Sequence, residues 1–410
     1  MTEFSGERLL FVGGGEESAP GIEHAKRLGL RTLVLDRNPT APGSATAENH
    51  LQSSIFDLEA AVSLSREEHA RERIDGVVSV ATDAPRTVAA IADALGLPSI
   101  GTESARLVSD KLAMKECFIA AGVATAAGRR VESGHDAASV VEELGEIVVI
   151  KPIDSRGARG VSIARTGADL LRHFDEAQRA SEAGVVLVEE YLAGPQYSTE
   201  SVVHDGRIAT VGISTRNYGR LAETYPYPVE DGGNLPAELS PDIRREIDEL
   251  LLAAATALGI ESGTVKGDLV LSAGKMRIIE LAGRLSGGYF ATHEIPLSTG
   301  VDLLEAAYKI SLGYPIDFSR LRPSRTVPVA QRYFFPVPGR VTSVNVPENL
   351  RVDPDIALLL VRVAAGDIVP AITNHPARAG LVITTGTDAV SAIRRAERAV
   401  REVEIVTVPL

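Results

Sequence analysis

Short apolar runs separated by amphipathic stretches mark the first quarter of the chain. The apolar run 9–12, three glycines and an Ala/Ile/Leu-patterned stretch at 21–28 predict a strand, a tight turn and a helix. Further strands are predicted at 31–35 and 74–80, and a further helix at 84–95. This alternation of strands and helices is typical of an open domain with a parallel sheet.

The middle of the chain changes to turns and short alternating strands. A helical pattern at 102–121 follows a short predicted strand at 98–101 and carries Lys111 and Lys115. Beyond it, Asp205-Gly206 between two alternating runs is a strong hairpin signal, and it favours a curved antiparallel sheet. The expected strands lie at 146–150, 161–163, 185–188, 201–204 and 208–213, and a helical apolar face at 243–258 follows them.

Two apolar runs at 265–271 and 276–281 carry one carboxylate each. Asp268 and Glu280 stand twelve positions apart, and the turn at Ala273-Gly274 predicts a hairpin that brings them together. Two adjacent carboxylates repel each other unless a cation intervenes, and hard oxygen ligands favour Mg²⁺. The alternative is an exposed hairpin with ordinary surface charges.

A glycine-rich loop at 154–160 follows the strand that delivers Lys151. It contains Ser155, Arg156, Gly157 and Gly160, and the chain then returns to a strand at 161–163. Glycines let backbone N–H groups close round an anion, and a lysine supplies positive charge, so this layout suits a phosphate group. The alternative is an ordinary glycine hairpin.

The last part of the chain predicts a small α/β unit after an Arg/Pro-rich crossing segment at 320–328. A helix at 301–312 precedes this segment and ends at Gly313. The expected elements beyond it are strands at 329–335, 340–346, 356–364 and 380–385 and a helix at 389–403.

Composition excludes several classes of function. The formal net charge of −13 disfavours binding to nucleic acid or to anionic lipid, and no apolar run approaches the ~20 residues that span a bilayer. The N-terminus lacks a charged-then-apolar leader, so we expect a cytoplasmic protein with no nucleic-acid or membrane partner. Cys117 is the single cysteine and the histidines are scattered, so neither a thiolate cluster nor a zinc site is expected.

Several motifs, taken in order, resemble the ATP-grasp superfamily of carboxylate–amine ligases. Glu280-Leu281-Ala282-Gly283-Arg284-Leu285-Ser286-Gly287-Gly288 is most similar to the signature of the L-amino-acid (dipeptide) ligase branch. The other motifs are Asp110-Lys111 with Met114-Lys115, Val149-Ile150-Lys151-Pro152 with 157–161, and Glu189-Glu190-Tyr191-Leu192.

The resemblance implies a fold and a division into domains. The fold is α/β (α+β), with an open parallel βα domain at 1–105 and a two-lobed ATP-grasp core. The small lobe with its lid loop would cover 106–195, the large lobe 196–320, and a C-terminal α/β cap 321–410.

The resemblance also implies an activity, with roles for individual residues. A carboxylic acid would be activated by ATP as an acyl phosphate, and an amine would displace phosphate. Mg²⁺, with Mn²⁺ as an alternative, would be bound by Asp268 and Glu280, while Arg284 and Lys151 would be catalytic. The residues expected to hold ATP are Lys111, Lys151, Ser155, Arg156, Gly157, Gly160, Glu189, Glu190, Tyr191, Leu192, Gln196 and Lys266.

This chain departs from the common superfamily pattern at four positions. Ala282 stands where an asparagine ligand is usual, and Asp268 replaces a longer glutamate, so the number and geometry of metal ions stay open. Gln196 replaces a frequent ribose-binding glutamate and still offers a neutral acceptor. Lys266 stands where histidine is frequent.

The partners expected from the resemblance are a small-molecule acid and a small-molecule amine, and a homodimer stays open. Arg216 or Arg220 would hold a carboxylate of the acid. The remaining candidate substrate residues are Tyr289, His293, Gly287 and Gly288.

Three other interpretations stay open. An ATP-dependent carboxylase of the same fold would activate bicarbonate instead of an organic acid. An NAD-binding oxidoreductase would use the glycines at 13–15 with Asp36 about 20 positions on. A non-catalytic nucleotide-binding protein would bind ATP without turnover.

Overall fold

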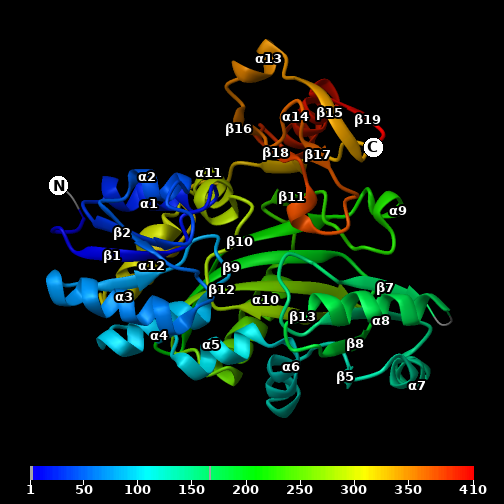
Figure 1. The fold of residues 1–410 in the computed structure, drawn as a ribbon, viewed down its shortest axis with the longest axis horizontal. Coiled ribbons are helices and arrows are strands. Elements are labelled where there is room, and N and C mark those ends of the chain that lie inside the picture. The colour runs from blue at the N-terminus through cyan, green and yellow to red at the C-terminus, as the bar shows by residue number, and fades with distance from the viewer. Residues whose placement is uncertain (1–2, 166–167) are drawn as a thin grey trace.

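The computed structural model describes residues 3–165 and 168–410, which form four sheets with helices packed around them (Figure 1). The N-terminal domain lies at the left of that view, the lobe with α7 and α8 at the lower right, and the C-terminal segment at the top. No helix within the described ranges is both long and apolar enough to span a membrane.

The N-terminal domain has a four-stranded parallel sheet in the order β3-β2-β1-β4, as the alternation predicted. Helices flank its strands, which explains why the central strands are continuous apolar runs. An isolated bridge between Val80 and Leu285 connects this domain to the hairpin region. Its elements are β1 (Arg8–Val12), α1 (Ala19–Arg27), β2 (Arg31–Asp36), α2 (Pro42–Thr46), β3 (Asn49–Gln52), α3 (Leu58–Arg71), β4 (Gly76–Val78) and α4 (Pro85–Leu95).

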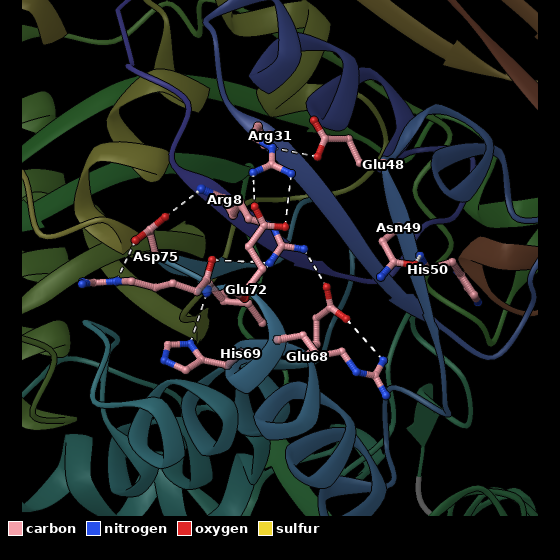
Figure 2. A network of polar contacts seen from close by, with 12 residues as sticks. Arg8, Arg31, Glu48, Asn49, His50, Glu68, His69, Glu72 and Asp75 are labelled. Atoms are coloured by element: carbon pink, nitrogen blue, oxygen red, sulfur yellow. Dashed lines mark hydrogen bonds and ion pairs between the residues drawn. The ribbon is translucent and has the colours of Figure 1, made fainter.

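A polar network ties β1 to α3 (Figure 2). Arg8 Nη2 donates to Glu68 Oε1 at 2.6 Å, and both side chains are buried. Arg8 Nη1 donates to the carbonyl oxygen of Glu72 at 2.6 Å, and the backbone N–H of Arg8 donates to Asp75 at 2.9 Å. These additional hydrogen bonds offset part of the desolvation of the buried ion pair. All four residues lie outside the cavity described below.

The small lobe is an antiparallel sheet in the order β5-β8-β6-β7, covered by two helices. Its core packs Val148, Ile150 and Val188 against Phe174. The glycine-rich loop connects β6 to β7, as predicted. The elements are β5 (Gly128–Val131), α7 (Gly134–Leu144), β6 (Ile147–Pro152), β7 (Ser162–Arg165), α8 (Ala168–Ala180) and β8 (Val186–Glu190).

The single helix predicted at 102–121 is wrong, because two helices, α5 (Thr102–Ser109) and α6 (Lys111–Ala120), meet at Asp110. Asp110 has extended backbone, and its carboxylate accepts the backbone N–H groups of Leu112 and Ala113. It therefore caps α6 and stops α5. The strand predicted at 98–101 is also wrong, since that segment forms no strand and leads directly into α5.

An eight-stranded sheet forms the large lobe, in the order β13-β12-β9-β10-β11-β14-β18-β16. Helix α10 packs its buried face, which includes Ile247 and Leu251, against this sheet. Its elements up to residue 321 are β9 (Gln196–His204), β10 (Arg207–Asn217), α9 (Leu221–Thr224), β11 (Gly232–Leu235), α10 (Pro241–Ala257), β12 (Ser262–Ser272), β13 (Lys275–Ala282), η1 (Phe290–Glu294), α11 (Ile295–Thr299), α12 (Leu303–Ser311) and η2 (Phe318–Leu321).

The C-terminal segment shares this sheet, because β14 pairs with β11 on one side and β18 on the other. Helix α14 covers β14 and β18, and its alanines pack on Ala330 and Val382. A separate three-stranded sheet has the order β17-β15-β19. The elements are β14 (Val329–Tyr333), β15 (Gly339–Asn345), α13 (Glu348–Arg351), β16 (Ile356–Val361), β17 (Ile368–Val369), η3 (His375–Ala377), β18 (Gly380–Thr385), α14 (Ala389–Glu402) and β19 (Glu404–Val408).

Candidate active site

A cavity of about 730 Å³ is lined by residues of both the small-lobe sheet and the eight-stranded sheet. Its wall contains most of the residues predicted from the sequence, contributed by α6, β6, β8, β9, β10, β12, β13, the glycine-rich loop and the segments that follow β8 and β13. The predicted residues that line it are Lys111, Lys151, Ser155, Arg156, Gly157, Glu189, Glu190, Tyr191, Leu192, Gln196, Arg216, Lys266, Asp268, Glu280, Arg284, Gly287 and Gly288.

Glu189 joins two lysines at the back of the cavity. Its carboxylate contacts Lys115 Nζ at 2.7 Å and Lys151 Nζ at 2.5 Å, and all three side chains are 5% exposed or less. Burial alone would raise the pKa of Glu189, but the charges of Lys151 and Lys115 outweigh burial and lower it. Lys115 also donates to Thr125 Oγ1 and to the carbonyl oxygen of Ala126. The Glu189 side chain therefore positions both lysines.

The glycine-rich loop is held from both sides. Lys111 Nζ donates to the carbonyl oxygen of Ser155 at 2.7 Å, and burial lowers the pKa of Lys111. On the other side, the backbone N–H of His375 donates to the carbonyl oxygen of Gly157 at 3.0 Å. Gly157 has φ +64°, and a Cβ there would lie 3.0 Å from the ring of Pro376, so glycine suits this close approach.

The predicted hairpin of β12 and β13 is confirmed, with Asp268 opposite Glu280 and a bulge immediately after Asp268. The Asp268 carboxylate forms ion pairs with Lys266 and with Arg216, whose Nη1 lies 3.2 Å away, and it accepts from Ser198 Oγ at 2.9 Å. Burial would raise the pKa of Asp268, yet Arg216 and Lys266 hold it well below its usual range. Asp268 is therefore ionised across the whole physiological pH range.

These two carboxylates fit a magnesium ion that a nucleotide brings with it. Magnesium is commonly bound by one or two carboxylates together with substrate phosphate oxygens. Asp268 and Glu280 stand opposite each other on the cavity wall and supply that donor set. Ala282 also lines the cavity, but its side chain has no atom that could bind a metal. Among the described residues, no group of three or more His, Cys, Asp or Glu side chains is placed to hold a metal without such phosphates.

Asp83 connects the predicted catalytic arginine to the glycine-rich loop. Arg284 Nε donates to Asp83 Oδ1 at 3.4 Å, and Arg156 Nε lies 3.6 Å from Asp83 Oδ2. Burial would raise the pKa of Asp83, but the charges of Arg284, Arg156 and Lys111 lower it. Sequence reasoning missed Asp83, which lies in the loop before α4 and far from Arg284 along the chain.

Four predicted residues do not line the cavity: Gly160, Arg220, Tyr289 and His293. Arg220 forms an ion pair with Glu223 and packs over the Phe335 ring. Tyr289 is 4% exposed and meets His293 edge to face, with ring centroids 5.1 Å apart. Neither aromatic side chain is therefore presented to the cavity.

A second end of the cavity is built from residues that the sequence did not indicate. Arg378 lies over the Tyr333 ring at 3.4 Å and donates to the carbonyl oxygens of His375 and Glu230. Glu17 accepts from Arg362 at 2.6 Å and from the backbone N–H of Gly288 at 2.6 Å. Burial, reinforced by Arg378 and other cations, lowers the pKa of His375 well below its ordinary value, so its ring is neutral. Besides Arg378, Glu17 and His375, the cavity residues missed at this end are Glu230, Glu294, Gln331, Tyr333 and Arg362.

The glycines at 13–15 have a different role. Asp36 Oδ2 accepts the backbone N–H of Gly14 at 2.9 Å, and its other oxygen accepts from Asn38. Neither these glycines nor Asp36 line the cavity. The Asp36 carboxylate thus holds the turn itself, which removes the main support for NAD binding.

Comparison with known families decides the classification. Residues 110–319, just over half of the chain, match the family described as carbamoyl-phosphate synthase L chain, ATP binding domain. Residues 22–99 match the ATP-grasp N-terminal domain. This chain belongs to the ATP-grasp superfamily. Residues 332–408 of this ATP-grasp protein match L-amino acid ligase C-terminal domain 2. The resemblance inferred from the motifs is confirmed.

Individual relatives and solved structures agree with this assignment. D-alanine–D-alanine ligase of Marinobacter nauticus is 30% identical over 176 residues, which are 42% of this chain, and the chain spans about half (53%) of that ligase. An L-amino acid ligase from Bacillus licheniformis has the same fold, with TM-score 0.84, 19% identity and coverage of 99% of this chain and 100% of that one. The expected α/β ATP-grasp fold is confirmed.

A further similar structure was solved with bound ligands. The biotin carboxylase domain of 2-oxoglutarate carboxylase from Hydrogenobacter thermophilus matches with TM-score 0.73 and 19% identity, over 98% of this chain and 90% of that one. That structure was solved with MgADP, ADP and bicarbonate. Because the identity is low, the likeness shows a shared fold.

Proposed function

We propose that this ATP-grasp protein is an ADP-forming ligase that activates a carboxylic acid as an acyl phosphate and couples it to an amine. Our candidate for the acid is an amino acid. The observation that carries the proposal is the cavity lined by both sheets, whose lining combines the cations Lys111, Lys151 and Arg284 with the paired carboxylates Asp268 and Glu280.

These charges match the electrostatic requirement of acid activation. Attack of a carboxylate on the terminal phosphoryl group of ATP brings two anions together. Lys151, held by Glu189, and Lys111 are cations whose positions are set before the substrates bind, so no reorganisation is needed at the moment of reaction. Asp268 and Glu280 would hold Mg²⁺, which supplies charge neutralisation on the phosphate oxygens when it is bound.

Arg284 is the residue we assign to the acyl group. Its planar guanidinium can donate two parallel hydrogen bonds, first to the acyl phosphate and then to the tetrahedral oxyanion. In the structure, Arg284 is held by Asp83 and by its Nη1 donation to the carbonyl oxygen of Leu285 at 3.2 Å. It is thus oriented before any ligand arrives.

The glycine-rich loop would act as the lid. An acyl phosphate hydrolyses when water reaches it, so the reaction needs a closed site. Contacts of this loop with Lys111 of α6 and with His375 of η3 support a closed position over the cavity.

The likeness to an L-amino acid ligase, which extends to its C-terminal domain, supports an amino acid as the acid. A carboxylase is the second candidate, favoured by the likeness to a carboxylase domain that was solved with MgADP and bicarbonate. ATP, Mg²⁺ and a pair of small molecules are the ligands that we propose.

Phosphate release from ATP and Mg²⁺ tests the proposal. Amino acids and small acids are supplied singly and in pairs with amines, and bicarbonate is varied separately. Release that needs an acid together with an amine supports the ligase. Release that follows bicarbonate alone would favour the carboxylase, and ATP binding without release in every combination would favour a non-catalytic nucleotide-binding protein.

A further inference from the structure

Glu294 is a buried carboxylate with no role in the reaction proposed above. It ends η1, a single π-helical turn, and lines the second end of the cavity. Only 3% of the residue is exposed, and among the residues that the structure describes its carboxylate has neither a hydrogen bond nor an ion pair. π-Helical turns are frequently found at functional sites.

The charged groups around Glu294 leave it without a counter-ion. Burial and the nearby Glu230 raise the pKa of Glu294 to about 8, against the opposing effect of Arg332. Arg332 is the cation that opposes this rise, but its Nη1 already donates to the carbonyl oxygens of Gly233 and Gln331 and to Asn234 Oδ1.

Glu230 itself is neutralised by Arg216 at 2.9 Å. A buried carboxylate without a partner is costly unless something charged or hydrogen-bonding arrives to meet it. An arriving cation would allow Glu294 to ionise, so a positively charged group is the ligand that this buried carboxyl favours.

We propose that Glu294 receives the ammonium group of the amine substrate. This inference rests on the proposed ligase function and adds a residue that selects amines entering as primary ammonium ions. The surrounding wall suits such a group, since Phe290 is apolar and Tyr333 offers a hydroxyl oxygen. Gln331 is oriented by its Nε2 donation to the carbonyl oxygen of Gly288, which leaves its amide oxygen as a further acceptor.

The same contact prepares the amine for attack. The ammonium gives one proton to the carboxylate of Glu294 and becomes a free amine. Its nitrogen attacks the carbonyl carbon of the acyl phosphate, the C–N bond forms, and the C–O bond to phosphorus breaks with its electron pair leaving on phosphate. The second proton of the nitrogen goes to the departing phosphate, so that an amide and inorganic phosphate result.

The test compares Glu294→Gln with the unaltered enzyme. Glutamine keeps the shape but loses the charge, so KM for the amine should rise about 10- to 100-fold, the range expected for loss of a hydrogen bond to a charged group. The acyl phosphate is measured separately by trapping with hydroxylamine, which is uncharged at neutral pH and needs no ammonium site. We expect the variant to retain hydroxamate formation at a rate within about twofold, because the acid half-reaction precedes amine binding.

Asp248→Asn is the matched control, because Asp248 is a partly buried carboxylate of α10 outside the cavity with a pKa raised by burial. This control should leave KM for the amine unchanged. Calorimetry in buffers of different ionisation enthalpy adds a second readout: amine binding near pH 7 should release close to one proton from the unaltered enzyme and none from Glu294→Gln.

Two outcomes would overturn the assignment of Glu294. One is an unchanged KM for the amine in Glu294→Gln with equal proton release. The other is a rise in KM for the acid alone, which would show that Glu294 meets an ammonium group on the acid. Absence of hydroxamate from the unaltered enzyme with every acid would instead reject the ligase function on which the inference rests.

Discussion

Replacing Glu189 by glutamine should destabilise the small lobe. The substitution keeps the volume but removes the single negative charge that Lys115 and Lys151 share at 2.7 and 2.5 Å. The ammonium groups of Lys115 and Lys151, whose side chains are only 4% and 5% exposed, would then lack the counter-ion that they share. Burial of an uncompensated charge is far more costly than the net gain from a buried pair.

The expected loss is about 3 kcal/mol, the lower end of the roughly 3–5 kcal/mol seen when one partner of a buried pair is removed. The lower end applies because Lys115 keeps its hydrogen bonds to Thr125 and to the Ala126 carbonyl oxygen. Phosphate oxygens of bound ATP would neutralise Lys151, so the loss should shrink when Mg²⁺ and ATP are present. Adding a second substitution, Lys115→Met, should recover at least about 1 kcal/mol of the lost stability, because it removes one of the two uncompensated positive charges.

Hydrogen exchange of the backbone amides in β6 and β8 is the appropriate assay, because a chain with four sheets does not unfold in one step. The opening constant of these strands should increase about 100-fold in Glu189→Gln. Protection within about 1 kcal/mol of the unaltered protein would refute the reasoning, as would a double variant less stable than the single one.

Three other variants test separate parts of the site. Arg284→Ala should lower the amide-forming rate by about 10²–10³ while calorimetry shows unchanged ATP affinity, and normal turnover would contradict its assignment. Gly157→Val should place a Cβ against Pro376 at a residue with positive φ, so the lid should no longer close fully and exclude water. ADP should then form in excess over the amide, and a one-to-one ratio of ADP to amide would contradict this. His375 is neutral when folded, so the stability that it contributes is full above pH ~6.5 and falls below that pH by about 1.4 kcal/mol per pH unit. The pH dependence of backbone hydrogen exchange in β18, the strand that follows η3, should lack that slope in His375→Gln, and an unchanged slope would contradict the assignment.

Local patterns predicted the hairpin that carries the two carboxylates. Two apolar runs and a turn at Ala273-Gly274 were sufficient, because both turn residues adopt positive φ and the register follows from the turn. The break at Asp110 was missed because the apolar pattern continues through it, although an aspartate before a helical run is also a capping signal. The short strand β3, at Asn49–Gln52, carries only one buried residue and thus no apolar run.

Cavity contacts between residues far apart in the chain could not be predicted, for a different reason. Arg362 meets Glu17 across 345 positions and Arg284 meets Asp83 across 201, so no local spacing relates these partners. Tyr289 was expected to be one of the substrate residues. It adopts φ +64° at the start of η1, and its ring is buried in the core instead.

Oxygen transfer tests the central claim most directly. The acid identified by phosphate release would be supplied with ¹⁸O in its carboxylate, together with its amine, ATP and Mg²⁺, and the released phosphate analysed by mass spectrometry. Activation as an acyl phosphate predicts one ¹⁸O atom in each phosphate, because a carboxylate oxygen attacks phosphorus and leaves with it. Phosphate that carries no label while amide accumulates would contradict the account.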